Sequence, residues 1–208
     1  MIDVLLAARL FMAASFVLAG VQDMKERAIS DFVWFPGIAG GIMSIYWCYA
    51  NLPGTLFYIE IFKFGMFSAI GVVFVLLGYA GQADAIAMMV IGADPYLLSF
   101  LALVVAAAVA AGHLVGVYRK GFLKGGLSIP IEQFKAQKQW LPMMIVNAGQ
   151  TIDITQDVNI SREDVISKAP PGSTVLVQYG LPVVTYIAIG YIAYLVASIL
   201  IFAGGALA

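Results

Sequence analysis

The sequence predicts an all-α polytopic membrane protein, with six transmembrane helices and a small α+β cytoplasmic insertion before the last helix. Three observations lead to this prediction. Of the 208 residues, 62% are hydrophobic and 11% are charged, whereas soluble domains contain about 25% charged residues. The apolar residues form five long runs and one shorter run. Nine of the eleven basic residues fall in only two of the segments between these runs.

The five long runs have the length that crosses a bilayer, because about 20 apolar helical residues span its hydrocarbon core. They cover residues 3–21, 32–50, 56–79, 96–118 and 176–203. The first lacks a basic n-region and a small-x-small cleavage site, so we expect a retained helix. In the third, Glu60 and Lys63 are spaced for a structural ion pair on one helix face. The short run, residues 84–92, ends at Asp94-Pro95 and alone would reach about half of the bilayer.

The basic residues decide whether the short run is a separate crossing, since one more crossing reverses the side of everything after it. Lys25 and Arg27 lie between the first two runs, and only Arg9 and Lys63 lie outside the two basic segments. The other seven are Arg119, Lys120, Lys124, Lys135, Lys138, Arg162 and Lys168. All nine share one side only if residues 84–92 cross and the chain turns at Asp94-Pro95. Both termini are then outside.

The resulting organisation has three parts. Residues 1–118 hold transmembrane helices one to five, residues 119–175 form the cytoplasmic insertion, and residues 176–208 form helix six. Within the insertion, residues 129–149 and 150–160 have the β-branched composition of strands, and Ser161 with Asp164 matches a capping box at a helix start. A segment of this size holds only a modest core. We expect a structural or substrate-positioning lobe.

This topology brings two aspartates to the same side of the membrane. Asp23 ends the first helix there, and Asp84 begins the fourth. If Asp94 marks the outer interface, Asp84 lies about 15 Å deeper, within the membrane, where an ionisable residue normally faces a partner or a water-filled cavity. Two carboxylates held close carry a single proton around neutral pH, which provides an acid and a base. Gly81 removes side-chain bulk before Asp84 and permits unusual dihedral angles there.

Two short motifs carry a resemblance to a known family. Asp23-Met-Lys25-Glu-Arg27-Ala-Ile29, followed by Trp34, together with Gly81-Gln82-Ala83-Asp84, resembles the type IV prepilin and preflagellin peptidases, and among them the archaeal members. These are intramembrane aspartyl proteases of the GxGD type. The resemblance covers the first four helices well and the rest in outline. Ala83 stands at the second glycine of the motif, as in archaeal members.

The resemblance implies a site and a substrate class. Asp23 and Asp84 would be the catalytic pair, with Gly81 and Ala83 supporting the site. The substrates would be type IV pilin-like or archaeal flagellin precursors, whose short basic leader is removed at the cytoplasmic face of the cell membrane. The chain has no CxxC pair, so the N-methylating activity of bacterial members is not implied.

Two further features each have two interpretations. Lys25 and Arg27 either set the topology and anchor lipid headgroups, or favour the ionised form of Asp23 and hold its loop. Gly180-Leu181-Pro182 interrupts the last apolar run. It either kinks the helix, or Gly180 and Pro182 line a cavity at membrane depth, in faint resemblance to the Pro-Ala-Leu element of related intramembrane aspartyl proteases.

Other function classes remain open at this point. A small proton-coupled transporter would use Asp23 and Asp84 as a proton relay, and a structural assembly subunit is a third alternative. Cys48 is the only cysteine and His113 the only histidine, so we expect no disulfide, metal or organic cofactor. The net charge of −1 gives no reason to expect nucleic acid. The expected partners are membrane lipid and the precursor substrates, and the oligomeric state is not predicted.

Overall fold

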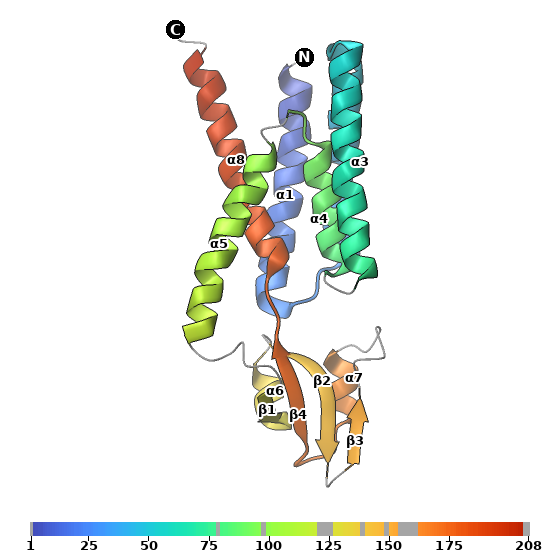
Figure 1. The fold of residues 1–208 in the computed structure, drawn as a ribbon, viewed down its shortest axis with the longest axis vertical. Coiled ribbons are helices and arrows are strands. Elements are labelled where there is room, and N and C mark those ends of the chain that lie inside the picture. The colour runs from blue at the N-terminus through green and yellow to red at the C-terminus, as the bar shows by residue number, and fades with distance from the viewer. Residues whose placement is uncertain are drawn as a thin grey trace. The chain divides into compact units, whose positions relative to one another are not determined.

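The computed structural model describes residues 2–77, 80–96, 99–119, 127–137, 140–147, 150–153 and 162–205. Its elements, in chain order, are the helices and strands labelled in Figure 1. They are α1 (Ile2–Glu26), a 3₁₀ turn (Asp31–Val33), α2 (Trp34–Asn51), α3 (Gly54–Leu76), α4 (Gln82–Ala93), α5 (Phe100–Arg119), β1 (Leu127–Pro130), α6 (Ile131–Ala136), β2 (Trp140–Asn147), β3 (Gln150–Asp153), α7 (Arg162–Lys168), β4 (Thr174–Tyr179) and α8 (Val183–Gly205).

The chain divides into two compact units, which we describe one at a time. The helical unit comprises residues 1–24, 28–110 and 182–208. The lobe comprises residues 25–27 and 111–181. Helix α5 begins in the first unit and ends in the second.

Among the described residues, four helices are long and apolar enough to cross a membrane: α1 from Val4, α3, α5, and α8 as far as Ile201. Only 17% of the most apolar stretch of α3 is buried by the rest of the protein. Large apolar side chains such as Phe62 and Leu76 are 73% and 79% exposed. Soluble proteins rarely expose apolar faces of this extent, whereas lipid tails solvate them. The chain is therefore a mostly helical membrane protein.

Helices α2 and α4 differ from these four. Helix α2 has 18 residues, but its apolar residues are interrupted by Pro36, by three glycines and by Asn51. Helix α4 has 12 residues and is about 18 Å long. Both segments are helical as predicted, while the count of six crossings stays a prediction.

The core of the helical unit is built on aromatic contacts and close helix approaches. Phe16 packs edge-on against Trp34 at 5.9 Å between ring centroids and lies 4.8 Å from the ring of Tyr191. On α8, Gly190 lies directly against the backbone carbonyl of Ala102 in α5, where any side chain would collide. Small residues at such crossings let helix backbones approach closely in a membrane. Helices α3 and α4 run side by side in opposite directions (Figure 1).

The lobe is a four-stranded antiparallel sheet with two short helices. Its strand order is β1-β4-β2-β3, with a bulge in β2 between Pro142 and Met144. Val175 and Val177 on β4 point into a core that they share with Phe134 and Trp140. The predicted β-strand content is therefore confirmed for residues 140–147 and 150–153, and so is the helix that contains Asp164. The predicted strand residues 154–160 and the capping residue Ser161 lie outside the described residues.

Two predictions about this segment are wrong. Residues 174–179 form β4, although the last transmembrane helix was expected from residue 176. Val175 and Val177, two residues apart, lie on the one buried face of a strand that pairs with β1 on one edge and β2 on the other. Residues 131–136, expected to be strand-like, form α6 because Ile131 and Phe134 are three residues apart and share one buried helix face.

The place of Gly180-Leu181-Pro182 changes as a consequence. These residues connect β4 to α8 and do not interrupt a helix. The carbonyl of Pro182 accepts the backbone N–H of Tyr186 at 3.2 Å, which is a bond of the first helical turn. Proline is well tolerated at a helix start because its missing N–H would have no partner there.

Candidate functional site

Asp23 lies in the last turn of α1 and is bound to the first turn of α8. Its side chain is buried, with 7% of its surface exposed. Its Oδ2 accepts the backbone N–H of Thr185 at 3.0 Å and lies 3.2 Å from the Thr185 hydroxyl. The backbone N–H groups at a helix start have no partner within the helix. Asp23 therefore caps α8 from another helix.

Asp84 lies in the first turn of α4 and is bound to the residue before that helix. Gly81 is the N-cap, and its backbone N–H donates to Asp84 Oδ2 at 2.8 Å. This is the return bond of a capping box, and the start of a helix favours a carboxylate electrostatically. The sequence motif around Asp84 is thus also a helix-start motif.

A cavity of about 290 Å³ lies beside Asp84. Apart from Asp84 itself, the side chains that line it are apolar and come from α3, α4, α8 and the residue Ala80. They belong to Gly71, Phe74, Ala80, Ala85, Met88, Val183 and Ile187. Among the described residues that line this cavity, Asp84 is the one with a polar side chain, so a polar substrate atom there would meet its half-buried carboxyl group.

Gly81 does not use the conformational freedom of glycine. Its backbone angles, φ −82° and ψ 167°, are accessible to any residue. An added Cβ would lie 3.6 Å from Asp84 Oδ2, an ordinary contact. The expected unusual dihedral angles are therefore absent, and what Gly81 supplies is its N–H group and the lack of bulk beside Asp84. Ala83 packs its methyl group against the core of the helical unit.

The first turn of α8 connects the two aspartates. Thr185 binds Asp23, and Val183, two residues earlier, lines the cavity that contains Asp84. The charge of Asp23 also acts on Asp84 electrostatically. The structure thus brings the two predicted carboxylates into one region of the helical unit, around the start of α8.

Lys25 and Arg27 belong to the lobe. Lys25 is exposed. Arg27 has a left-handed backbone conformation, with φ 54°, and its guanidinium lies 6.0 Å from the centre of the Tyr179 ring. A cation over an aromatic face is attracted to it. This contact favours the interpretation in which Arg27 holds the segment after Asp23.

Gly180 and Pro182, predicted as possible cavity lining, are both buried and flank exposed Leu181. Neither is among the described residues that line the cavity beside Asp84. They lie immediately before Val183, so they set where α8 starts. From α8, the cavity beside Asp84 is lined by Val183 and Ile187.

Sequence reasoning missed a second polar cluster, centred on Asp94. Asp94 is completely buried within the protein, while its place at the outer interface stays a prediction. Its Oδ1 accepts from Arg9 Nε at 3.1 Å and Nη2 at 2.9 Å, and its Oδ2 accepts from the Tyr191 hydroxyl at 2.7 Å. Lys63 donates to the Asp94 backbone carbonyl and pairs with Glu60 at 2.7 Å, the ion pair that the sequence predicted. A lone arginine within an apolar run was the signal, since such a residue needs a buried partner.

This second cluster ties together the same helices as the aspartate region. Arg9 is on α1, Asp94 directly follows α4, and Tyr191 is on α8. Arg9 and Asp23 are separated by about 21 Å along α1, and Asp84 and Asp94 by about 15 Å along α4. The charged cluster therefore fixes the helix ends opposite to those that carry Asp23 and Asp84.

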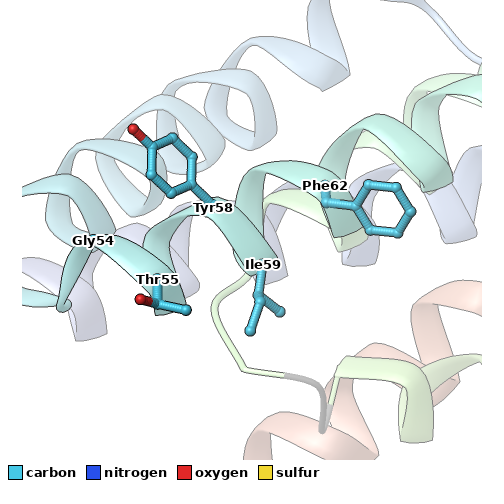
Figure 2. A pocket seen from close by; sticks show the side chains of 5 residues that line it. All are labelled: Gly54, Thr55, Tyr58, Ile59 and Phe62. Carbon is cyan, nitrogen blue, oxygen red and sulfur yellow. The ribbon is translucent and has the colours of Figure 1, made fainter.

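A broad hollow on α3 is not part of this region. It is lined by Gly54, Thr55, Tyr58, Ile59 and Phe62, all from the first turns of α3 (Figure 2). Asp84 follows the other end of α3 in the chain. The residues that line it carry no carboxyl, imidazole or thiol group, so this hollow lacks the groups that usually perform acid–base chemistry.

The chemistry available in the region is that of two carboxylates. Among the residues that the structure describes, no group of three or more His, Cys, Asp or Glu side chains is placed to hold a metal ion. Comparisons with protein-family models, curated proteins and solved structures find no match to this chain.

Proposed function

We propose that this chain is an intramembrane aspartyl endopeptidase in which Asp23 and Asp84 share one proton and activate water. The observation that supports it best is that each carboxylate is held by a backbone amide in one helical unit. Thr185 donates to Asp23 at 3.0 Å, and Gly81 donates to Asp84 at 2.8 Å. An amide donor orients a carboxylate without permanently neutralising it, so both groups stay available for proton transfer.

The reaction needs one ionised and one protonated carboxyl group. The ionised member removes a proton from water while the water oxygen forms a bond to the peptide carbonyl carbon. The protonated member gives its proton to the carbonyl oxygen, which yields a neutral gem-diol. The C–N bond then breaks as the nitrogen takes a proton from one carboxyl group, and one gem-diol hydroxyl returns a proton to the other. The pair ends with one proton, as it began.

The proposed arrangement in the membrane has six crossings, with α2 and α4 added to the four long helices. The distribution of basic residues supports a cytoplasmic location for Asp23, Asp84 and the lobe. The proposed substrates are precursors of type IV pilins or archaeal flagellins, which carry a short basic leader. Glu26, the last residue of α1, and Asp31, in the 3₁₀ turn before α2, are both exposed and would attract such a leader electrostatically.

The test is cleavage of a detergent-solubilised pilin-like precursor by the wild type, Asp23→Asn and Asp84→Asn. Both variants should lose cleavage because an amide neither accepts nor supplies the proton. Both should fold, because an asparagine Oδ1 can still accept the Thr185 or Gly81 amide. Glu132→Gln is the control, since it removes an exposed carboxylate on α6 that has no part in the proposed site, and it should cleave like the wild type.

The outcomes separate the proposal from its rivals. Cleavage that survives in Asp23→Asn or Asp84→Asn, at wild-type stability, contradicts the shared-proton mechanism. Proton flux into vesicles that requires both aspartates, without cleavage, would instead support the proton-coupled transporter.

A further inference from the structure

The start of α8 gives Asp23 a donor set that Asp84 lacks. Thr185 is the third residue of α8, and both its N–H and its hydroxyl group lie against Asp23 Oδ2, at 3.0 and 3.2 Å. Asp23 and Thr185 are each 7% exposed. The two residues are 162 positions apart in the chain. The contact is therefore made in the tertiary structure and is shielded from solvent.

These donors favour the charged form of Asp23. A carboxylate is stabilised by hydrogen bonds donated to it and by the positive end of a helix. Asp84 also accepts one amide N–H, from Gly81. The other described residues around Asp84 form the apolar lining of its cavity, which includes Phe74, Met88 and Ile187, and such a lining disfavours charge. The asymmetry points to a proton on Asp84.

The Thr185 hydroxyl has a second acceptor within reach. It lies 2.9 Å from the backbone carbonyl of Gly20 and carries a single hydrogen. While Asp23 is ionised, the hydroxyl donates to Asp23. Once Oδ2 has taken a proton, that proton can be donated to Thr185 Oγ1, and the Thr185 hydrogen turns to Gly20. Asp23 therefore keeps its partners after it takes the proton of water, but the bonds donated to the ionised carboxylate are the stronger ones, so Thr185 still favours the ionised form.

We infer that Thr185 is a positioning residue that holds Asp23 as the ionised member of the pair, the base that receives the proton of water, and leaves the shared proton on Asp84. This inference rests on the proposed function. Asp84 on α4 interacts electrostatically with Asp23, and the charged residues Lys25, Glu26 and Arg27 follow Asp23 in the chain. Substitution of Thr185 leaves all of them in place.

Two substitutions of Thr185 separate the contribution of its hydroxyl group from that of its backbone N–H. Thr185→Val has nearly the same shape and keeps the backbone amide but removes the hydroxyl, whereas Thr185→Ser keeps both. Thr55→Val, at an exposed position on α3, is the control for the same chemical change elsewhere. Thermal unfolding of each variant shows whether it is folded.

The first measurement is site-resolved carboxyl ¹³C NMR of the full-length protein at neutral pH, with Asp23 and Asp84 assigned by the loss of each signal in the Asn variants. In the wild type, Asp84 should have the shift of a carboxylic acid and Asp23 that of a carboxylate. Thr185→Val should move the Asp23 signal toward the acid, while Thr185→Ser should leave it unchanged. A protonated Asp23 in the wild type, or no movement in Thr185→Val, would overturn the inference.

The second measurement is precursor cleavage. Thr185→Val should lower kcat about tenfold or more, the effect of losing one hydrogen bond to a charged group, with little change in KM. Thr185→Ser should stay within about twofold of the wild type because it keeps that bond. Equal losses in Thr185→Val and Thr185→Ser would overturn the role of the hydroxyl. If the wild type does not cleave, the proposed function fails, and the NMR signals still test which aspartate is charged.

Discussion

Removal of Arg9 should destabilise the helical unit strongly. Arg9→Leu leaves the carboxylate of Asp94 fully buried without its cation. Loss of one partner from a buried ion pair typically lowers the free energy of unfolding by about 3–5 kcal/mol. The Tyr191 and Tyr194 hydroxyls still donate to Asp94, at 2.7 and 3.3 Å. We therefore expect the lower end of that range, about 3 kcal/mol.

The contribution of Arg9 can be isolated within the same cluster. Tyr194→Phe removes the 3.3 Å bond to Asp94 and the 3.0 Å bond that the Tyr194 hydroxyl accepts from Arg9 Nη2, and it should cost about 1–2 kcal/mol. Arg9→Leu combined with Asp94→Leu should be less destabilised than the sum of its two single changes, with a coupling energy of about 2 kcal/mol, since neither charge is left alone.

The assay is unfolding by SDS in mixed micelles, followed by tryptophan fluorescence. Trp34 is 1% exposed in the helical core, so its emission reports on helix separation. Glu132→Gln is the control, because Glu132 pairs with Lys135 at 3.5 Å with 73% and 42% of their side chains exposed. Exposed pairs of this kind contribute less than about 0.5 kcal/mol. If Arg9→Leu changes stability as little as Glu132→Gln does, the inference of a structural charge cluster is refuted.

Two further predictions concern glycines. Gly190→Ala places a methyl group against the Ala102 carbonyl and should lower the free energy of unfolding by about 1–3 kcal/mol. Gly112→Ala in α5 is the control, because nothing lies within 4 Å of its Cβ position, and it should be neutral or stabilise the helix by up to about 1 kcal/mol. Equal SDS midpoints for the two variants would contradict the close crossing of α8 and α5. Gly81→Ala should fold like the wild type, because its backbone angles suit alanine. Any loss of precursor cleavage in it then measures crowding beside Asp84, and a large loss of thermal stability would show that this account of Gly81 is wrong.

Local patterns in the sequence were sufficient for several features of the structure. Apolar run length predicted helices over all six segments, and the Glu60–Lys63 spacing predicted an ion pair found at 2.7 Å. These features depend on residues a few positions apart, so the chain near them determines the outcome. The placement of Asp23 and Asp84 at helix ends has the same origin.

In two segments of the lobe, contacts with residues distant in sequence decided between strand and helix. Residues 174–179 are apolar enough for the predicted helix, but they pair with β1 on one side and β2 on the other. Residues 131–136 were predicted as strand, but Ile131 and Phe134 find a common core in the helical conformation. In both cases tertiary contacts outweighed the local preference.

The sequence by itself determined a helical membrane protein with one aspartate at the end of α1 and another at the start of α4. Only the tertiary structure decided what surrounds them. The bonds from Arg9 to Asp94 and from Thr185 to Asp23 join residues 85 and 162 positions apart. Such pairs produce no recognisable sequence pattern, because a buried polar group forms its hydrogen bonds with whichever partner the packing of the helices brings close to it.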